Sequence, residues 1–396
     1  MKILDVLPSV NPELGGPAEV VRQRGIYLAS LGHVVEVLTL DDSRAAFLQN
    51  YPLPIHALGP SMTGYGYNKQ LLPWLQSHAQ RFDAVVVEGL WQYHGFGTWR
   101  ALRGTPVPYY IFAHGMLDPW FKRRYPLKHL KKWLYWPWAE YRVLRDAAAT
   151  LFTTEQERLL ARQSFWLYRS RERVVAFGTT RPPSDAARVR ESFITRFPQT
   201  RGRHLLVFLG RIHEKKGCDL LVQAFARVAA IDPQLHLVMA GPDQTGWSPT
   251  LQAMAASLGV AERISWPGML KDDLKWGALY SADAFVLPSH QENFGIAVAE
   301  ALACGVPVLI SDKVNIWQEI QADGAGFVDA DTVAGTESLL RRWLGLDEGQ
   351  RVRFRQQARR TFESRFAIEA SANDLVQVIR DTREAAAQGK AVLSEP

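Results

Sequence analysis

Residues 288–308 read PSHQENFGIAVAEALACGVPV. An apolar run at 284–287 precedes them, and helix-forming alanines fill 297–304. Gly305 stops the helix, and β-branched residues resume at 306–310. The pattern predicts strand, loop, helix and strand. The start of this helix turns free backbone N–H groups and a positive dipole end toward the loop before it, which suits a phosphate.

Two carboxylates border this joint, Glu292 in the loop and Glu300 about one turn inside the helix. They flank the same anion site without sharing a helix face. Carboxylates accept hydrogen bonds from paired hydroxyls, as on a sugar or a ribose. An ordinary surface loop with a capping carboxylate and a core helix is the alternative interpretation.

A basic turn follows the predicted strand 205–209 and reads GRIHEKKG at 210–217. Arg211 contributes a planar guanidinium and Lys216 a compact ammonium, a combination that suits a diphosphate. A chance basic turn is the alternative.

Together the two runs resemble the signature of retaining glycosyltransferases of the two-Rossmann-domain (GT-B) type, most closely family 4, the glycosyl transferases group 1. Family 4 members usually show Glu-Gly-Phe-Gly-Leu, and this chain has Asn293 and Ile296 in place of the Gly and the Leu. The resemblance implies an α/β fold with two Rossmann-like domains facing each other across a cleft. It also implies a C-terminal helix that crosses back to the first domain.

The same resemblance implies the domain boundaries. We expect an acceptor-binding Rossmann-like domain at 1–177, completed by the C-terminal helix at about 366–390. A linker is expected at 178–203, where the Pro182-Pro183 pair lies. A nucleotide-sugar-binding Rossmann-like domain is expected at 204–365.

Site roles also come from the resemblance. It implies that Glu292 meets hydroxyls of the donor sugar and that Glu300 holds the nucleotide ribose. The implied catalytic residues are His114, Arg211, Lys216 and Glu292. The implied donor-binding residues are Gly16, Arg211, Lys216, Met269, Leu270, Glu292, Asn293, Phe294, Gly295, Ile296 and Glu300.

In the first half, apolar runs at 2–7, 84–87, 108–112 and 149–152 alternate with helical patterns and predict a parallel sheet. Ligands gather at the carboxyl ends of such strands, where His114 stands, although a lone His is more often structural. The Gly15-Gly16 loop lacks the G-x-G-x-x-G spacing, which disfavours a dehydrogenase.

No metal and no cofactor beyond a nucleoside diphosphate sugar are expected. The sequence Asp329-Ala330-Asp331 has the D-x-D form of metal-dependent transferases. A helical pattern begins at Val333, so Asp331 or Thr332 is better interpreted as its N-cap.

At 396 residues, with 47% hydrophobic and 22% charged residues, the chain is typical of a soluble globular protein of two domains. It has no run of 18 apolar residues and no signal-peptide pattern, so we expect a cytoplasmic location. The two cysteines, Cys218 and Cys304, have neither metal-ligand nor disulfide spacing and are interpreted as packing residues.

The net charge of +6 is uneven, with +7 in residues 1–180 and −1 in the remainder. Residues 120–145 interleave Lys and Arg with Trp and Tyr, as in segments that lie on membranes. A solvated helix face and nucleic-acid binding are the alternatives. We expect an anionic membrane surface as partner, no nucleic acid, and a peripheral position on the inner membrane face.

The resulting hypothesis is a retaining hexosyltransferase that moves a sugar from a nucleoside diphosphate sugar to an acceptor hydroxyl. The acceptor is expected to be a lipid-linked saccharide in cell-surface polysaccharide or glycolipid synthesis. The alternatives are a sugar-nucleotide epimerase or phosphorylase of the same fold, or a non-catalytic protein that binds nucleotide sugars or anionic lipids.

Overall fold

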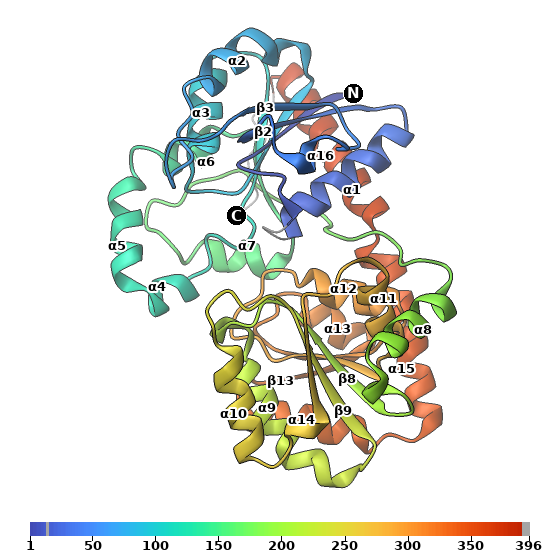
Figure 1. The fold of residues 1–396 in the computed structure, drawn as a ribbon. Helices are drawn as coiled ribbons and strands as arrows, with labels where there is room; N and C mark the ends of the chain where they lie inside the picture. Colours follow the sequence, from blue (N-terminus) through green and yellow to red (C-terminus); the bar gives the residue numbers. More distant parts are fainter. Residues whose placement is uncertain (13–15, 390–396) are drawn as a thin grey trace. The chain divides into compact units, whose positions relative to one another are not determined.

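The computed structural model describes residues 1–12 and 16–389. The chain forms two compact units (Figure 1). The first unit runs from Met1 to Gly178 and takes in the chain again from Ile368, and the second unit is Thr179–Ala367.

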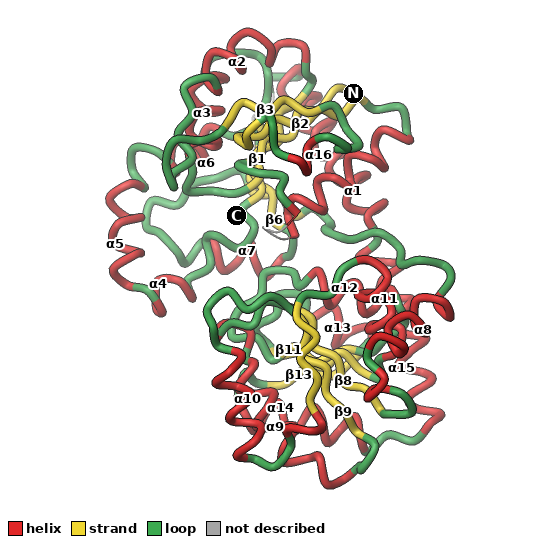
Figure 2. The backbone as a smooth tube through the Cα atoms, in the orientation of Figure 1, coloured by secondary structure: helices red, strands yellow, loops and turns green. Residues whose placement is uncertain are grey.

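The described residues of the first unit build a seven-stranded sheet in the order β3-β2-β1-β4-β5-β6-β7, with every pairing parallel (Figure 2). Its central strands are apolar and buried on both faces, as parallel strands between helices must be. The strands are β1 (Lys2–Leu7), β2 (Val34–Asp42), β3 (Ile55–Gly59), β4 (Ala84–Glu88), β5 (Tyr109–Phe112), β6 (Ala149–Phe152) and β7 (Glu172–Val174).

Helices cover both faces of this sheet. Helices α1 and α16 pack side by side on one face, and α2, α3 and α6 form a contiguous layer on the other (Figure 1). The helices are α1 (Gly16–Ser30), α2 (Leu71–His78), α3 (Tyr93–Leu102), α4 (Trp120–Arg124), α5 (Pro126–Tyr135), α6 (Glu140–Asp146), α7 (Glu155–Ala161) and α16 (Ile368–Ala387), with short 3₁₀ turns η2 (Ala46–Leu48) and η3 (Ala79–Arg81).

The second unit contains a six-stranded parallel sheet in the order β10-β9-β8-β11-β12-β13. The strand order reverses direction between β8 and β11, which is where doubly wound sheets bind ligands. The strands are β8 (His204–Leu209), β9 (Leu235–Ala240), β10 (Ile264–Gly268), β11 (Ala284–Leu287), β12 (Val308–Ser311) and β13 (Gly326–Asp329).

Around this sheet, α9 packs with α10 and α14, whereas α12 and α13 pack with α15. The helices are α8 (Ala186–Arg196), α9 (Cys218–Val228), α10 (Ser248–Ser257), α11 (Asp272–Ser281), α12 (Ile296–Ala303), α13 (Trp317–Asp323), α14 (Val333–Leu344) and α15 (Glu348–Thr361), with 3₁₀ turns η4 (Pro198–Thr200), η5 (Glu214–Lys216), η6 (Ala229–Ile231) and η7 (Ala261–Arg263) and the π-helical turn η8 (Phe362–Phe366).

The prediction of two parallel Rossmann-like sheets is confirmed, and so is the C-terminal helix that returns to the first unit beside α1. The stretch 178–203, predicted as a linker, holds helix α8, which packs on α11. Gly277 allows this approach, because a Cβ there would lie 2.1 Å from the Val189 carbonyl oxygen. The helix was missed because it buries only Val189 and Phe193, too few apolar residues to show a clear period.

Candidate active site

The loops after strands β8 to β12 are joined to one another at the carboxyl edge of the second sheet. Backbone hydrogen bonds of 2.8–3.0 Å connect them, so each loop is held in place by its neighbours. This edge is where α/β sheets bind ligands. The bonds run from Gly210 N to Ala240 O, Gly241 N to Gly268 O, His290 N to Lys215 O, Glu292 N to Lys313 O and Asn315 N to Glu292 O.

Glycine is required where two of these loops meet. Gly217 ends the basic turn with φ +65°, and a Cβ there would lie 2.2 Å from the Pro288 carbonyl oxygen. Any larger residue would push the basic turn away from the loop that carries Glu292. The two sequence runs that predicted the site are therefore in direct backbone contact.

The side chains of Lys216 and Glu292 meet at this junction as an ion pair. They are nearly covered, with 12% and 16% of each side chain exposed. Burial, together with the nearby charges of Lys215 and Arg211, lowers the pKa of Lys216 to about 7. Glu292 supplies the anion beside this ammonium. Arg211 itself is exposed at the same edge.

Helix α12 starts directly after this pair. Its N-cap is Gly295, with φ +79°, and no side chain caps the helix. Phe294 is buried and packs edge-on against Phe366, with ring centroids 5.5 Å apart. The first backbone N–H groups of α12 therefore lie behind Glu292 without a capping side chain, a suitable place for an anion.

The remaining predicted donor contacts lie around the same helix. Glu300 is buried inside α12 and accepts a hydrogen bond from Lys275 Nζ at 2.7 Å. Asn293 lies 3.5 Å from the Asn315 amide, and Ile296 is half-buried. At the end of β10, Met269 is 46% exposed and Leu270 is buried.

In the first unit, His114 stands two residues beyond the end of β5. Its Nε2 lies 2.5 Å from Glu88 Oε2, and Glu88 is the last residue of β4. The ring stacks on Phe112 at a centroid distance of 5.4 Å. The backbone of His114 has φ +47°, a left-handed conformation that costs roughly 1–2 kcal/mol for a residue with a Cβ.

A cluster of buried charged side chains, which the sequence analysis did not predict, lies behind His114. Arg24 Nη2 donates to Asp5 Oδ1 and to Glu88 Oε1, each at 2.7 Å, and all three side chains are 1% exposed. Burial and the Glu88 charge raise the pKa of Asp5 to about 7 despite Arg24. For Glu88, Arg24 and His114 outweigh the burial and lower the pKa. Of the two carboxyls, Glu88 is therefore the stronger acid, and Asp5 is the one that takes up a proton first as the pH falls.

Gly16, the predicted contact in the first loop, is half-buried at the start of α1. Its neighbour Gly15 lies outside the described residues. Both cysteines are buried, in line with a packing role.

Two family models divide the chain. The model for glycosyl transferases group 1 matches residues 190–361, and the model for the glycosyl transferase 4-like domain matches residues 15–178. The chain belongs to the glycosyl transferases group 1 family. The predicted family is thus confirmed.

Among curated relatives, this family member is similar to D-inositol 3-phosphate glycosyltransferases. The protein from Salinispora tropica is 34% identical over 203 residues, which is 48% of this chain and 40% of that protein. The protein from Geodermatophilus obscurus is 34% identical over 160 residues, 37% of this chain and 35% of that protein. The chain thus spans well under half the length of these relatives.

Solved structures share the fold of this family member at low identity. Sucrose-phosphate synthase from Thermosynechococcus elongatus has a TM-score of 0.75 at 19% identity and covers 97% of this chain and 100% of its own. Anabaena Alr3699/HepE in complex with UDP and glucose has a TM-score of 0.74 at 16% identity, covering 98% and 100%. Both indicate the same two-sheet fold.

In the D-x-D stretch of this family member, Asp331 and the following Thr332 both have protein partners in the second unit. Thr332 caps α14 by accepting from Gly335 N at 3.0 Å, as one of the two predicted alternatives had it. Asp331 is not the cap, because its carboxylate pairs with His290 Nδ1 at 2.8 Å. Across residues 1–12 and 16–389, no three His, Cys, Asp or Glu side chains gather as metal ligands would.

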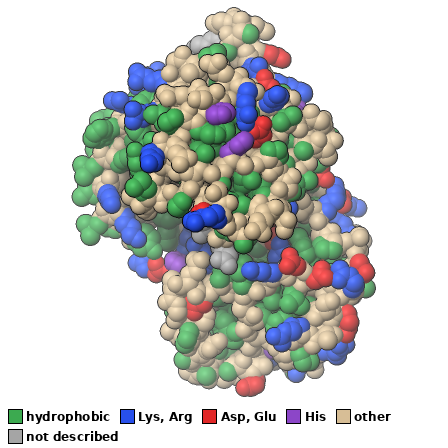
Figure 3. All heavy atoms as spheres, turned by 45° about the horizontal axis from the view of Figure 1, so that its top comes forward, with side chains coloured by type: hydrophobic (Ala, Val, Ile, Leu, Met, Phe, Trp, Pro, Cys, Tyr) green, Lys and Arg blue, Asp and Glu red, His purple; other side chains and the backbone are tan. Residues whose placement is uncertain are grey.

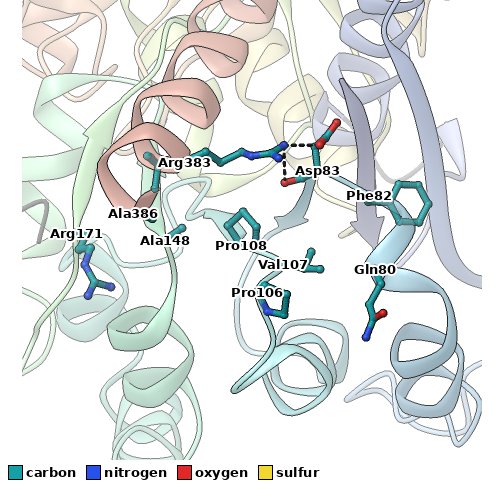
Figure 4. A pocket seen from close by; sticks show the side chains of 11 residues that line it. Gln80, Phe82, Asp83, Pro106, Val107, Pro108, Ala148, Arg171, Arg383 and Ala386 are labelled. Atoms are coloured by element: carbon teal, nitrogen blue, oxygen red, sulfur yellow. Dashed lines mark hydrogen bonds and ion pairs between the residues drawn. The ribbon is translucent and has the colours of Figure 1, made fainter. Parts of the chain in front are cut away.

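The first unit also has a surface pocket of about 540 Å³ (Figure 4). It lies at the amino edge of the first sheet, at the amino ends of β4 and β5, whereas His114 lies at the carboxyl edge. In this pocket Arg383 of α16 pairs with Asp83. Arg171 lies on the other side of Pro106 and Pro108. Its lining is Gln80, Phe82, Asp83, Pro106, Val107, Pro108, Ala148, Arg171, Thr382, Arg383 and Ala386.

Proposed function

We propose that the protein is a retaining glycosyltransferase that moves a hexose from a nucleoside diphosphate sugar to an acceptor hydroxyl. The observation that carries the proposal is the partly exposed Lys216–Glu292 pair beside Arg211, close to the uncapped start of α12. A diphosphate would meet two cations and free N–H groups at one place. The sugar attached to it would meet a carboxylate.

Donor binding would exchange partners within this pair. The diphosphate takes the Lys216 ammonium, because its charge replaces that of Glu292, and the released carboxylate accepts from sugar hydroxyls. When the bond between the anomeric carbon and the phosphate oxygen breaks, its electron pair goes to the phosphate. Arg211, Lys216 and the helix N–H groups stabilise that charge.

The acceptor hydroxyl then attacks the anomeric carbon from the face that the phosphate leaves, and its proton passes to the leaving phosphate. Configuration is retained, and no carboxylate is consumed as a nucleophile. His114 is assigned to the sugar and acceptor side of the reaction. Glu300 would hold the ribose once Lys275 has released it.

The first donor to test is UDP-glucose, because Anabaena HepE, a structural neighbour, has been solved with it. Thermal shift with UDP, GDP, ADP and their sugars should raise the unfolding midpoint for one base only. Purified protein should then hydrolyse or transfer from that sugar nucleotide, and Arg211→Ala should reduce the shift and lower the turnover about a hundredfold. Binding without turnover would support a binding protein, and interconversion of sugars an epimerase; either would contradict the proposal.

An acceptor on a membrane is supported by the surface of α5. None of its residues is buried, and Leu127, Leu130 and Leu134 are 82%, 58% and 68% exposed on one face. Lys128 and Lys131 flank them. Hydrophobic and basic side chains lie next to one another along the left edge of the first unit, the side of α5 in Figure 1 (Figure 3).

This arrangement fits a helix lying in the interface of an anionic bilayer. Among the described residues no helix has both the length and the apolar character needed to cross a bilayer. We therefore propose peripheral attachment through 120–145, on the inner membrane face, with a lipid-linked saccharide as acceptor. The inositol phosphate named for the Salinispora relative is the soluble alternative.

Vesicle co-sedimentation tests the attachment. Arg123→Glu, Lys128→Glu and Lys131→Glu together should release the protein, since each cation near an anionic leaflet contributes about 1 kcal/mol. Lys132 is left intact because its ammonium packs 4.5 Å from the Trp91 ring. The control reverses three exposed cations of the second unit, Lys271, Arg353 and Arg360. Equal binding to neutral lipid, or no effect of the triple substitution in α4 and α5, would favour a soluble acceptor.

A further inference from the structure

The imidazole of His114 is held on three sides. Phe112 stacks on it, Phe177 meets it edge-on at a centroid distance of 5.8 Å, and Glu88 Oε2 lies 2.5 Å from Nε2. Within the described residues, Nδ1 has no hydrogen-bond partner. One ring nitrogen is therefore committed to the protein and the other is left for a ligand.

The backbone of His114 is held as firmly as its ring. Gly115 N donates to Glu157 Oε1 at 2.6 Å, and Ala113 N donates to Leu151 O at 3.2 Å. These bonds maintain the left-handed φ of +47°. A strained residue that its surroundings over-determine is typical of a functional position.

The charge of Glu88 has its own support. Arg24 Nη2 bonds Glu88 Oε1, so the carboxylate uses one oxygen for Arg24 and the other for His114. Asp5 shares the same guanidinium nitrogen, and burial together with the Glu88 charge raises its pKa, so Glu88 is the carboxyl of the two that ionises first. An ionised carboxylate only accepts, so the hydrogen between Glu88 and Nε2 must belong to the imidazole.

We propose that Glu88 is a positioning residue that holds a proton of His114 on Nε2, so that Nδ1 is left to accept a hydrogen bond from a sugar hydroxyl. This inference rests on the proposed function for its ligand, but its geometry lies entirely within the first unit. Arg24 acts one step further back by keeping Glu88 charged. The arrangement parallels the carboxylate that fixes a catalytic histidine in hydrolases, with the roles of the two ring nitrogens exchanged.

The test uses two variants and a matched control. Glu88→Gln keeps the size but removes the charge, and its amide can donate to Nε2. Glu88→Asp keeps the charge near Arg24 but withdraws the oxygen from Nε2, so it serves if the amide variant folds poorly. The control is Glu172→Gln, another buried carboxylate held by arginines, at the amino end of β7.

Both Glu88 variants should lower kcat roughly 10- to 100-fold, with little change in the donor KM. The control should keep the wild-type kcat. In a His114→Ala background, Glu88→Gln should cost nothing further in kcat, because the group it positions is gone. A loss of the same size in both backgrounds would mean that Glu88 is merely structural and would overturn the proposal.

The tautomer can be measured without turnover. In protein labelled with ¹⁵N-histidine, the His114 signals, assigned by their loss in His114→Ala, should report a neutral ring protonated at Nε2. Glu88→Gln should shift the ring toward protonation at Nδ1. A wild-type proton on Nδ1 would overturn the proposal. Absence of any transferase activity would instead contradict the proposed function, while the tautomer result would still decide the role of Glu88.

Discussion

The two units differ in how far the charged side chains near the carboxyl edges of their sheets are exposed to solvent. In the second unit, Lys216 and Glu292 lie in loops that approach one another through glycine, with 12% and 16% of their side chains exposed. In the first unit, Arg24 of α1 and Asp5 of β1 pair between the helix and the sheet, each 1% exposed. A charge that must exchange its partner for a ligand stays reachable. A charge that only positions another side chain is buried. Removing it should lower the stability of the fold before it lowers the catalytic rate.

The largest expected effect is on the cluster of buried charged side chains. Arg24→Leu removes the one cation between two buried carboxylates, so we predict a loss of about 3–5 kcal/mol in the free energy of unfolding. Denaturant unfolding measures it. The matched control is Arg188→Leu, which breaks an exposed ion pair with Asp273 in the second unit and should leave the midpoint unchanged. Equal losses of unfolding free energy in the two variants would contradict the proposed difference between the two units.

The reachable cations should behave in the reverse manner. Arg211→Ala or Lys216→Ala should lower kcat about a hundredfold, roughly 3 kcal/mol, because the charge they stabilise grows as the sugar–phosphate bond breaks. The unfolding midpoint should hardly move. Arg227→Ala, which removes an exposed pair with Glu337, provides the control. Full activity of the Arg211, Lys216 double variant would remove both from the site.

A smaller effect depends on pH. Glu140 is buried and accepts a hydrogen bond from Trp91 N at 2.6 Å. Burial raises its pKa to about 7, although this hydrogen bond and the Lys132 charge both act to lower it. The folded state therefore keeps a proton that the unfolded state releases above about pH 4.5. This stabilises the fold at low pH, and the contribution is lost as the pH rises through 7.

Glu140→Gln should consequently gain stability relative to wild type, by about 1–3 kcal/mol, between pH 5 and pH 8. Parallel denaturant curves at the two pH values measure this change. The control is Glu337→Gln in the second unit, where hydrogen bonds from Arg341 and Arg227 lower the pKa of the carboxyl. That group is ionised throughout the window, so its variant should show no trend, and a trend of equal size would contradict the assignment.

The smallest expected effect is that of a chelator. With Arg211 and Lys216 on the diphosphate, and Asp331 paired with His290, turnover should survive EDTA. Steady-state rates before and after chelation measure it. Loss of activity that magnesium restores would show that the second unit also uses a metal ion, which would require carboxylates beyond those assigned here.

The same contrast explains what the sequence could predict. The proposed donor-side residues lie in two short runs, so their spacing was visible, and the apolar strands between them indicated the fold. Arg24 meets Asp5 and Glu88 across 19 and 64 residues, and no local pattern encodes such pairs. One signal was present: Asp5 interrupts the otherwise apolar strand KILDVL, and a charge inside a buried strand requires a partner.

The C-terminal helix has a further consequence for how this protein can be taken apart. Because α16 belongs to the first unit, the second unit is an insertion, and its two ends meet: Thr179 N donates to Phe366 O at 3.0 Å, and Thr179 bridges Ala367. Two cuts at adjacent points would release residues 179–367 as one continuous piece. A second unit from another family member could be joined at the same two residues, so that, under the proposed function, the specificity for the nucleotide sugar would be exchanged without rebuilding the first unit.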